Sequence, residues 1–103
     1  MVPTGVAVAL PPDVCGLVVP LSGLAAGHGI GVVNGPGLID PNYRGEVKVI
    51  LVNHGADAYT AEAGDRIAQL LLVAFAAPAV SIVDELPPSG DDRGTGGFGS
   101  SGR

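Results

Sequence analysis

The aspartate at position 40 is the residue whose type and place point most directly to chemistry. Gly37 and Pro41 flank the pair Ile39–Asp40, so the backbone must turn there. Residues 46–53 then alternate as in a strand. A carboxylate held on a turn at the mouth of a sheet can accept a proton from water and so act as a general base. The alternative is an Asx turn, in which the side chain caps its own loop, and from these residues alone that role is the more common one.

Two other side chains near this aspartate offer directed contacts. Tyr43 puts an aromatic ring three positions further along the chain, and the ordinary role of such a ring is a half-buried contact at a strand edge. Asn34 presents a donor and an acceptor side by side. A plain turn asparagine is at least as common, so both roles stay open for Asn34.

Short apolar runs separated by Gly and Pro must position these residues. The run 67–75 fits a helix or a strand by periodicity alone, and the flanking Gly64 and Pro78 favour a strand. One helical turn over residues 22–28, capped by Ser22, and a turn over residues 34–40 are also expected. The full set of expected strands is 3–10, 15–19, 30–33, 46–53, 59–62, 67–75 and 80–86. Several short strands at this spacing predict a sandwich, barrel or jelly roll.

Composition agrees with a small all-β protein. The 103 residues fit one domain, and the core must be aliphatic, because the chain has two Phe, two Tyr and no Trp. A small aliphatic core is marginal alone, so association of subunits would help. A net charge of −5 with scattered basic residues argues against a nucleic-acid partner. The chain has no apolar run of membrane-spanning length and no basic signal-peptide start, which predicts a cytoplasmic protein without a membrane partner.

The cysteine and the histidines do not indicate a metal site. Cys15 is the single cysteine, which excludes an intramolecular disulfide, and it stands in an apolar run like a small buried hydrophobe. His28 and His54 are not spaced with each other or with Cys15 as ligands. We therefore expect no metal held by protein side chains.

Four segments carry a pattern in a fixed order. They are PLSGLAAGHGI (20–30), GLIDPNYRGEVKVILVN (37–53), GDRIAQLLL (64–72) and DRGTGGFGSSGR (92–103). In this order and spacing they resemble motifs two to five of the trimeric dUTPases. VPTGVAVALP (2–11) resembles the strand before the second motif of that family, and VVNGPG (32–37) the run into the third. The resemblance covers nearly the whole chain.

The resemblance implies an all-β, jelly-roll-like fold of the dUTPase (β-clip) type, in a homotrimer with sites shared between subunits. Residues 1–86 would form the β domain, and residues 87–103 a flexible glycine-rich arm that crosses to a neighbour. The implied reaction is hydrolysis of dUTP to dUMP and pyrophosphate, which limits uracil in DNA and supplies dUMP for dTMP synthesis. Mg²⁺ is the implied cofactor, held mainly through the triphosphate, because it prefers phosphate oxygens and water.

Roles for the residues of the third motif follow from the same resemblance. Asp40 would activate the water that attacks the α-phosphorus. The ring of Tyr43 would lie beneath the deoxyribose and exclude a 2′-hydroxyl by clash. Asn34, with backbone groups of Gly37 and Ile39, would recognise uracil and exclude thymine by its methyl group.

The second and fourth motifs would hold the phosphates. Ser22 and Gly23 would bind oxygens at the start of a helical turn, and Gln69 would donate without adding charge. The alternatives are a simple N-cap for Ser22 and an amide on a strand surface for Gln69.

The fifth motif is typical of a lid that orders over substrate and excludes water. Arg93 would meet the γ-phosphate and Phe98 would stack over uracil. Gly99 would let the backbone approach the phosphates, and Ser100 would add a hydroxyl. The alternative is a plain disordered tail.

Two departures from the family pattern bear on activity. The first motif, Ala-Gly-x-Asp-Leu, is expected upstream of residue 2, so we expect the chain to be truncated at its N-terminus. Leu21 stands where arginine is usual, which removes a contact worth roughly 1.5–3 kcal/mol, or one to two decades of affinity. Two alternatives therefore stay open: a trimeric nucleotide-binding or interaction module without turnover, and a relative of the dCTP deaminases, which share the fold. The turn 40–45 fits the dUTPase pattern better than the deaminase one.

Overall fold

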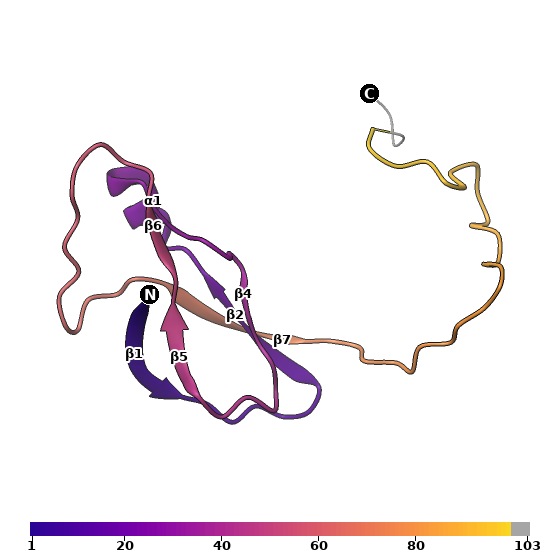
Figure 1. The fold of residues 1–103 in the computed structure, drawn as a ribbon, viewed down its shortest axis with the longest axis horizontal. Coiled ribbons are helices and arrows are strands. Elements are labelled where there is room, and N and C mark those ends of the chain that lie inside the picture. Colours follow the sequence, from indigo (N-terminus) through magenta and orange to yellow (C-terminus); the bar gives the residue numbers. More distant parts are fainter. Residues whose placement is uncertain (100–103) are drawn as a thin grey trace.

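The computed structural model describes residues 1–99 and shows a small β body from which a long C-terminal extension departs (Figure 1). The elements within those residues are β1 (Val2–Ala7), β2 (Val14–Val19), α1 (Ser22–His28), β3 (Ile30–Val32), β4 (Gly37–Ile39), β5 (Glu46–Val49), β6 (Leu51–Asn53) and β7 (Gln69–Ala74). Every pairing among them is antiparallel: β1 with β5, β3 with β6, and β4, β2 and β7 in that order. The all-β expectation is confirmed. No helix in the described part of the chain is long and apolar enough to cross a membrane.

The core is small and aliphatic, as the composition predicted. Its main cluster comes from β2, β3, β4 and β5 and consists of Val18, Val32, Ile39, Val47 and Val49. Cys15 and Ile30 are buried as well. Along β5 the buried Val47 and Val49 alternate with less buried residues, as expected for a strand with one covered face. Val49 is the most buried of the five, at 3% exposure, and no described side chain is completely buried.

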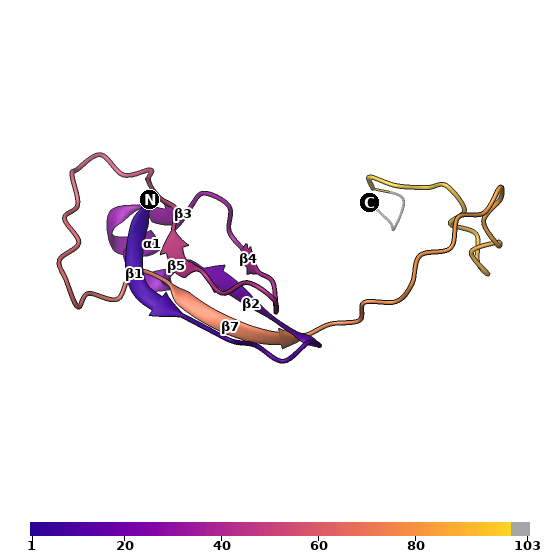
Figure 2. The same ribbon diagram turned by 60° about the horizontal axis from the view of Figure 1, so that its bottom comes forward.

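Strand β7 is bonded along its whole length but covered on neither face. Six residue pairs join it to β2, from Val14 opposite Ala74 to Val19 opposite Gln69. All six of its side chains are nevertheless exposed, and Leu72 reaches 62%. Figure 2 shows β7 lying across the outside of the body, with the chain leaving directly from its end.

The extension makes the molecule long. Residues 75–99 contain no helix or strand. The radius of gyration is 19.0 Å, whereas a compact chain of this length would have about 13 Å. The expected strand at 80–86 is therefore wrong for this chain on its own, because an apolar segment forms a strand only where a partner edge is available, and Val80 is 90% exposed.

Four other expectations need correction. Residues 59–62 form no strand. The stretch 46–53 is two strands, because β5 pairs with β1 while β6 pairs with β3. The helix over 22–28 forms as expected, but its N-cap is Leu21 and no side chain caps it, so the assignment of Ser22 as the cap is wrong. The expected turn over 34–40 is also interrupted, because residues 37–39 are drawn into β4 by pairing with β2.

Candidate functional site

The turn that follows β4 is fixed by several hydrogen bonds. The Tyr43 N–H donates to the carbonyl oxygen of Asp40 at 3.1 Å. The Arg44 guanidinium donates to the carbonyl of Pro41 at 2.7 Å and to that of Tyr43 at 3.1 Å. The Tyr43 hydroxyl donates to the carbonyl of Glu46 at 2.9 Å. The turn is thus held both by its main chain and by two of its side chains.

The Asp40 carboxylate is left free by this arrangement. It is exposed, and among the hydrogen bonds of residues 1–99 none uses its side chain, because the turn closes on the Asp40 carbonyl instead. The geometry therefore differs from an Asx turn, in which the side chain would accept the bond. A carboxylate that accepts no bond from its own turn is available to orient water and take its proton.

Asp40 and Tyr43 border the same hollow. It measures about 310 Å³ and is also lined by Ile39 and Lys48. On its other side Asp40 borders a second hollow, of about 560 Å³, with Arg44 and Phe75. Tyr43 is 44% exposed as a residue, and its hydroxyl donates a hydrogen bond to the backbone.

Asn34 and Gly37 are brought together at the start of β4. A side-chain carbon at position 37 would lie 3.1 Å from Nδ2 of Asn34 and 3.4 Å from Cβ of Val18, so the amide packs directly on the glycine. Because β4 lies at the edge of its sheet, backbone groups on its outer side are not paired within that sheet. Ile39 is buried in the core, so only its backbone is available to a ligand. We call Asn34, Gly37, Asp40 and Tyr43 the turn site.

A second group of candidates lies around the end of β2. Ser22 and Gly23 are the first, exposed residues of α1, and Gln69 is the first residue of β7. Gln69 pairs with Val19, and the chain from Val19 to Ser22 spans at most about 10 Å. We call Ser22, Gly23 and Gln69 the helix site.

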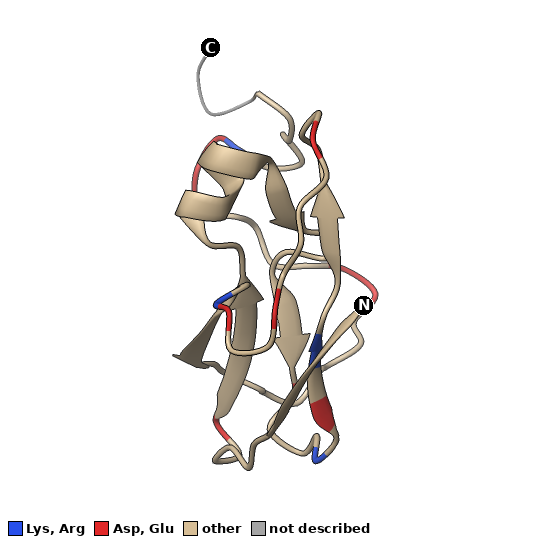
Figure 3. Ribbon diagram, turned by 90° about the vertical axis from the view of Figure 1, so that its left-hand side faces the viewer, with Lys and Arg blue, Asp and Glu red and all other residues tan. Residues whose placement is uncertain are grey.

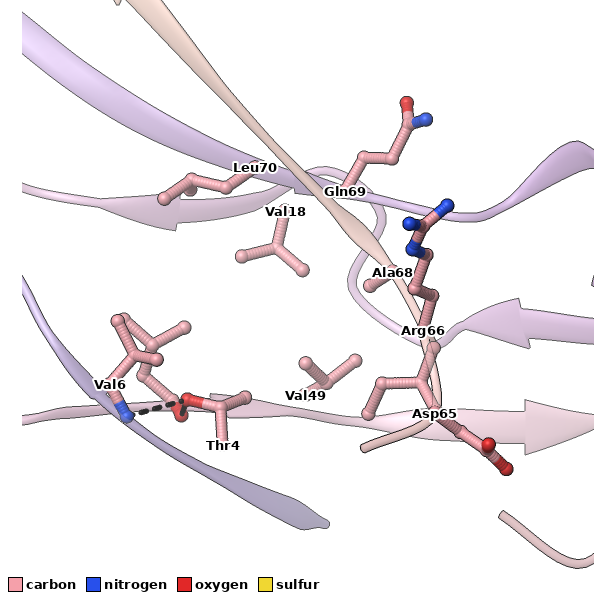
Figure 4. Close-up of a pocket in the computed structure, with 11 residues that line it drawn as sticks. Thr4, Val6, Val18, Val49, Asp65, Arg66, Ala68, Gln69 and Leu70 are labelled. Atoms are coloured by element: carbon pink, nitrogen blue, oxygen red, sulfur yellow. Dashed lines mark hydrogen bonds between the residues drawn. The ribbon is translucent and has the colours of Figure 1, made fainter. Parts of the chain in front are cut away.

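Arg66 is a further candidate beside the helix site, and it is not among the site residues expected from the sequence. Figure 4 shows its guanidinium and the Gln69 amide extending in the same direction from the rim of a hollow. That hollow measures about 250 Å³, and its floor is apolar, with Val18, Val49 and Leu70.

The candidates of the C-terminal extension do not reach either site. Arg93 is occupied locally: its Nε donates to the carbonyl of Gly96 at 2.8 Å, and its N–H donates to the carboxylate of Asp91 at 2.9 Å. Phe98 is fully exposed and Gly99 has a positive φ of 94°. Figure 1 shows this segment well away from the β body. Ser100 lies outside the described residues.

Asp40 and Tyr43 of the turn site line a different hollow from Gln69 of the helix site, whereas Gly37 lies across β2 from Leu70. Figure 3 shows acidic and basic residues spread over the body rather than gathered in one place. Within residues 1–99 no group of three or more His, Cys, Asp or Glu side chains could hold a metal ion. One subunit therefore offers two partial sites, each with few charged groups.

The chain is similar to known proteins over nearly its whole length. The family model described as dUTPase matches residues 1–102. A relative named deoxyuridine 5′-triphosphate nucleotidohydrolase, from Anaeromyxobacter sp. (strain Fw109-5), is 53% identical over all 103 residues, which correspond to 69% of that relative. The dUTPase of Staphylococcus bacteriophage 80alpha, solved with dUpNHpp, superposes with a TM-score of 0.79 at 27% identity, over 94% of this chain and 72% of the other.

A mutant form of the 80alpha phage dUTPase, solved separately, gives a TM-score of 0.74 at 26% identity, over 91% of this chain and 70% of the other. These matches confirm the jelly-roll-like dUTPase fold expected from the sequence. They also agree with the motif order, since the family match and the 53% identical relative extend across all four motifs. The chain belongs to the dUTPase family.

Proposed function

We propose that this chain hydrolyses dUTP to dUMP and pyrophosphate, with Asp40 as the general base. The observation that carries the proposal is the free Asp40 carboxylate, which borders open hollows on a turn fixed by four other hydrogen bonds. Water held by this carboxylate would attack the α-phosphorus and lose its proton to Asp40, and pyrophosphate would leave. Because the turn is already fixed, little reorganisation would be needed at the moment of reaction.

The turn site would recognise the nucleoside. The unpaired edge of β4 and the Asn34 amide offer donors and acceptors that suit the edge of uracil. The exposed part of the Tyr43 ring would support the deoxyribose and leave no room for a 2′-hydroxyl. This assignment is supported by the shared hollow of Asp40 and Tyr43, which would place sugar and α-phosphate next to each other.

The helix site would hold the phosphates, and a neighbouring subunit would supply it. Gln69 and Asp40 line different hollows of one chain, and the apolar side chains of β7 are uncovered. Both observations support a homotrimer in which the turn site of one subunit meets the helix site of another. The arm residues Arg93, Phe98, Gly99 and Ser100 would then close over the bound nucleotide.

Mg²⁺ would be held mainly by the triphosphate and water, because it prefers phosphate oxygens and water to a full set of protein ligands. When bound there, it would neutralise charge on the phosphate oxygens. None of the roles given to Asp40, Tyr43 or Gln69 depends on the ion. A cytoplasmic location stays a prediction from the sequence.

The proposed reaction is tested by pyrophosphate release from dUTP, dCTP, dTTP and UTP in parallel, with and without a chelator. We expect release from dUTP alone, and loss of it with the chelator. Ammonia release from dCTP would instead identify a deaminase. Binding of dUTP without pyrophosphate release, by an assembled protein, would identify a binding module and overturn the proposal.

The shared site is tested by mixing two inactive variants. Asp40→Asn damages the turn site and Gln69→Ala damages the helix site. If the two sites meet across subunits, trimers assembled from both variants contain some intact pairs, and activity returns on co-assembly. Failure to recover activity in mixed trimers, shown by mass to be mixed, would place both residues in one subunit's site. The control is the double variant, which offers no intact pair in any mixture.

A further inference from the structure

Gly45 is the residue that the Tyr43 ring lies on. If position 45 carried a side-chain carbon, that carbon would lie 2.5 Å from Cζ of Tyr43 and 2.8 Å from Cε1, and closer still to the hydroxyl oxygen. Distances below 3.0 Å are essentially never found for real Cβ atoms. The ring therefore occupies the space in which any other residue would have its side chain.

The backbone at this position does not by itself demand glycine. Gly45 is absent from the glycines with positive φ, so its φ lies outside the left-handed region that only glycine adopts readily. This separates it from Gly29 and Gly64, which have φ of 71° and 91°. Space for the ring, rather than backbone freedom, accounts for glycine at position 45.

The ring is otherwise held by one bond. Its hydroxyl donates to the Glu46 carbonyl at 2.9 Å, which folds the ring back over the turn. The main chain of Tyr43 is fixed by its bond to Asp40 and by Arg44. With the main chain fixed, a group inserted at position 45 can be accommodated only by moving the ring, and the hydroxyl bond would break as it moved.

We infer that Gly45 is a positioning residue that sets the plane of the Tyr43 ring, and through it the selection of deoxyribose over ribose. The inference rests on the proposed role of Tyr43 beneath the sugar. Gly45 does not touch substrate in this account. It acts by leaving space for the hydroxyl end of the ring against the backbone at position 45, while Tyr43 also borders the hollow that it shares with Asp40.

The kinetic test compares Gly45→Ala with the matched control Gly27→Ala. Both changes add one methyl group, but position 27 lies in α1 and has nothing within 4 Å of the added carbon. We expect the ratio of kcat/KM for dUTP to that for UTP to fall about tenfold or more in Gly45→Ala and to stay unchanged in Gly27→Ala. In a Tyr43→Ala background, Gly45→Ala should change that ratio by less than about twofold, because no ring is left to displace.

A second test needs no turnover. The chain has two tyrosines, Tyr43 and Tyr59, so their ring signals in a proton NMR spectrum are readily told apart. The full-length chain should show a nuclear Overhauser contact between the Tyr43 ring and the α-protons of Gly45. Gly45→Ala should shift the Tyr43 ring signals and leave those of Tyr59, which contacts His28, in place.

The outcomes separate this inference from the proposed function. An unshifted Tyr43 ring in Gly45→Ala, or no contact with Gly45 in the unaltered chain, overturns the positioning role whatever the activity. If Tyr43→Ala leaves the ratio of kcat/KM for dUTP to that for UTP unchanged, Tyr43 does not select the sugar, and Gly45 then has no part in that selection. A shifted ring together with a lowered ratio supports both.

Discussion

Residues 37–49 and residues 69–99 stand in contrast, although both carry family motifs. The first region closes on itself: β4 and β5 place Ile39, Val47 and Val49 in the core, and the turn between them is bonded internally. The second region is open. β7 pairs with β2 through its backbone, but its side chains are uncovered, and the extension beyond it contacts mainly itself.

The contrast shows which part of the function one chain can build alone. The turn site needs only short-range bonds and the local core, so one subunit orders it. The helix site and the arm lack the neighbours that would cover them. We therefore expect changes in the first region to act on chemistry and stability within a subunit, and changes in the second to act on substrate capture in the assembly.

The largest effect is expected from Asp40→Asn. Loss of a general base lowers turnover by about 10³-fold, while binding of a non-hydrolysable dUTP analogue stays close to that of the unaltered chain. Pyrophosphate release and calorimetry measure the two quantities.

The matched control is Asp13→Asn, which changes an exposed aspartate whose carbonyl accepts the Phe75 N–H. Its turnover should stay within roughly twofold. Equal activity of Asp40→Asn and the unaltered chain would remove Asp40 as the base and leave the closed region with no chemical role.

Deletion of the C-terminal arm should have the second largest effect on activity. A stop after Pro88 removes the segment from Ser89 onward and should lower kcat/KM for dUTP by about 10²-fold. The melting temperature should be unchanged, because residues 89–99 are almost all exposed and their hydrogen bonds lie within 89–96. An active deletion variant would show that the open region takes no part in catalysis.

Leu21→Arg should increase the affinity for dUTP. A cation placed beside the helix site should lower KM for dUTP about ten- to hundredfold, and this decrease in KM should be smaller in high salt. Leu21→Gln, which adds polarity without charge, serves as the control. If Leu21→Arg changes nothing, Arg66 beside Gln69 already supplies the needed charge, and Arg66→Ala should then weaken binding.

The smallest effect on turnover is expected from paired truncations in the two regions. Val49→Ala should lower the free energy of unfolding by about 2 kcal/mol, from lost burial and a small cavity. Val80→Ala, at 90% exposure, should stay within about 0.5 kcal/mol in the isolated subunit. Urea unfolding of both variants measures the difference. A comparable cost for Val80→Ala would mean that the extension is packed, against another copy, before substrate binds.

Patterns within the sequence were enough to predict most of the strands and the place of the turn. Apolar alternation over 46–49 and the Gly–Pro bracket around Asp40 act through neighbouring residues, so they are visible in the chain itself. The order of the motifs is also visible in the chain itself, and it predicted the family and the dUTPase fold. The roles of Asp40, Tyr43, Gln69 and the arm residues stay predictions until the variants above are measured.

The partners that each segment finds had to be read from the tertiary structure. Residues 80–86 are rich in apolar side chains but find no partner edge, and α1 begins at the N-cap position Leu21 with no side-chain cap from Ser22. The contact between the Tyr43 ring and Gly45 depends on the conformation of the closed turn, and the periodicity of the sequence does not predict that conformation. Local propensity and turn chemistry are properties of neighbours in sequence, and the chain determines those by itself. Which edges pair, which faces are left uncovered and where a ring comes to rest depend on groups brought together by folding, so only the tertiary structure decided them.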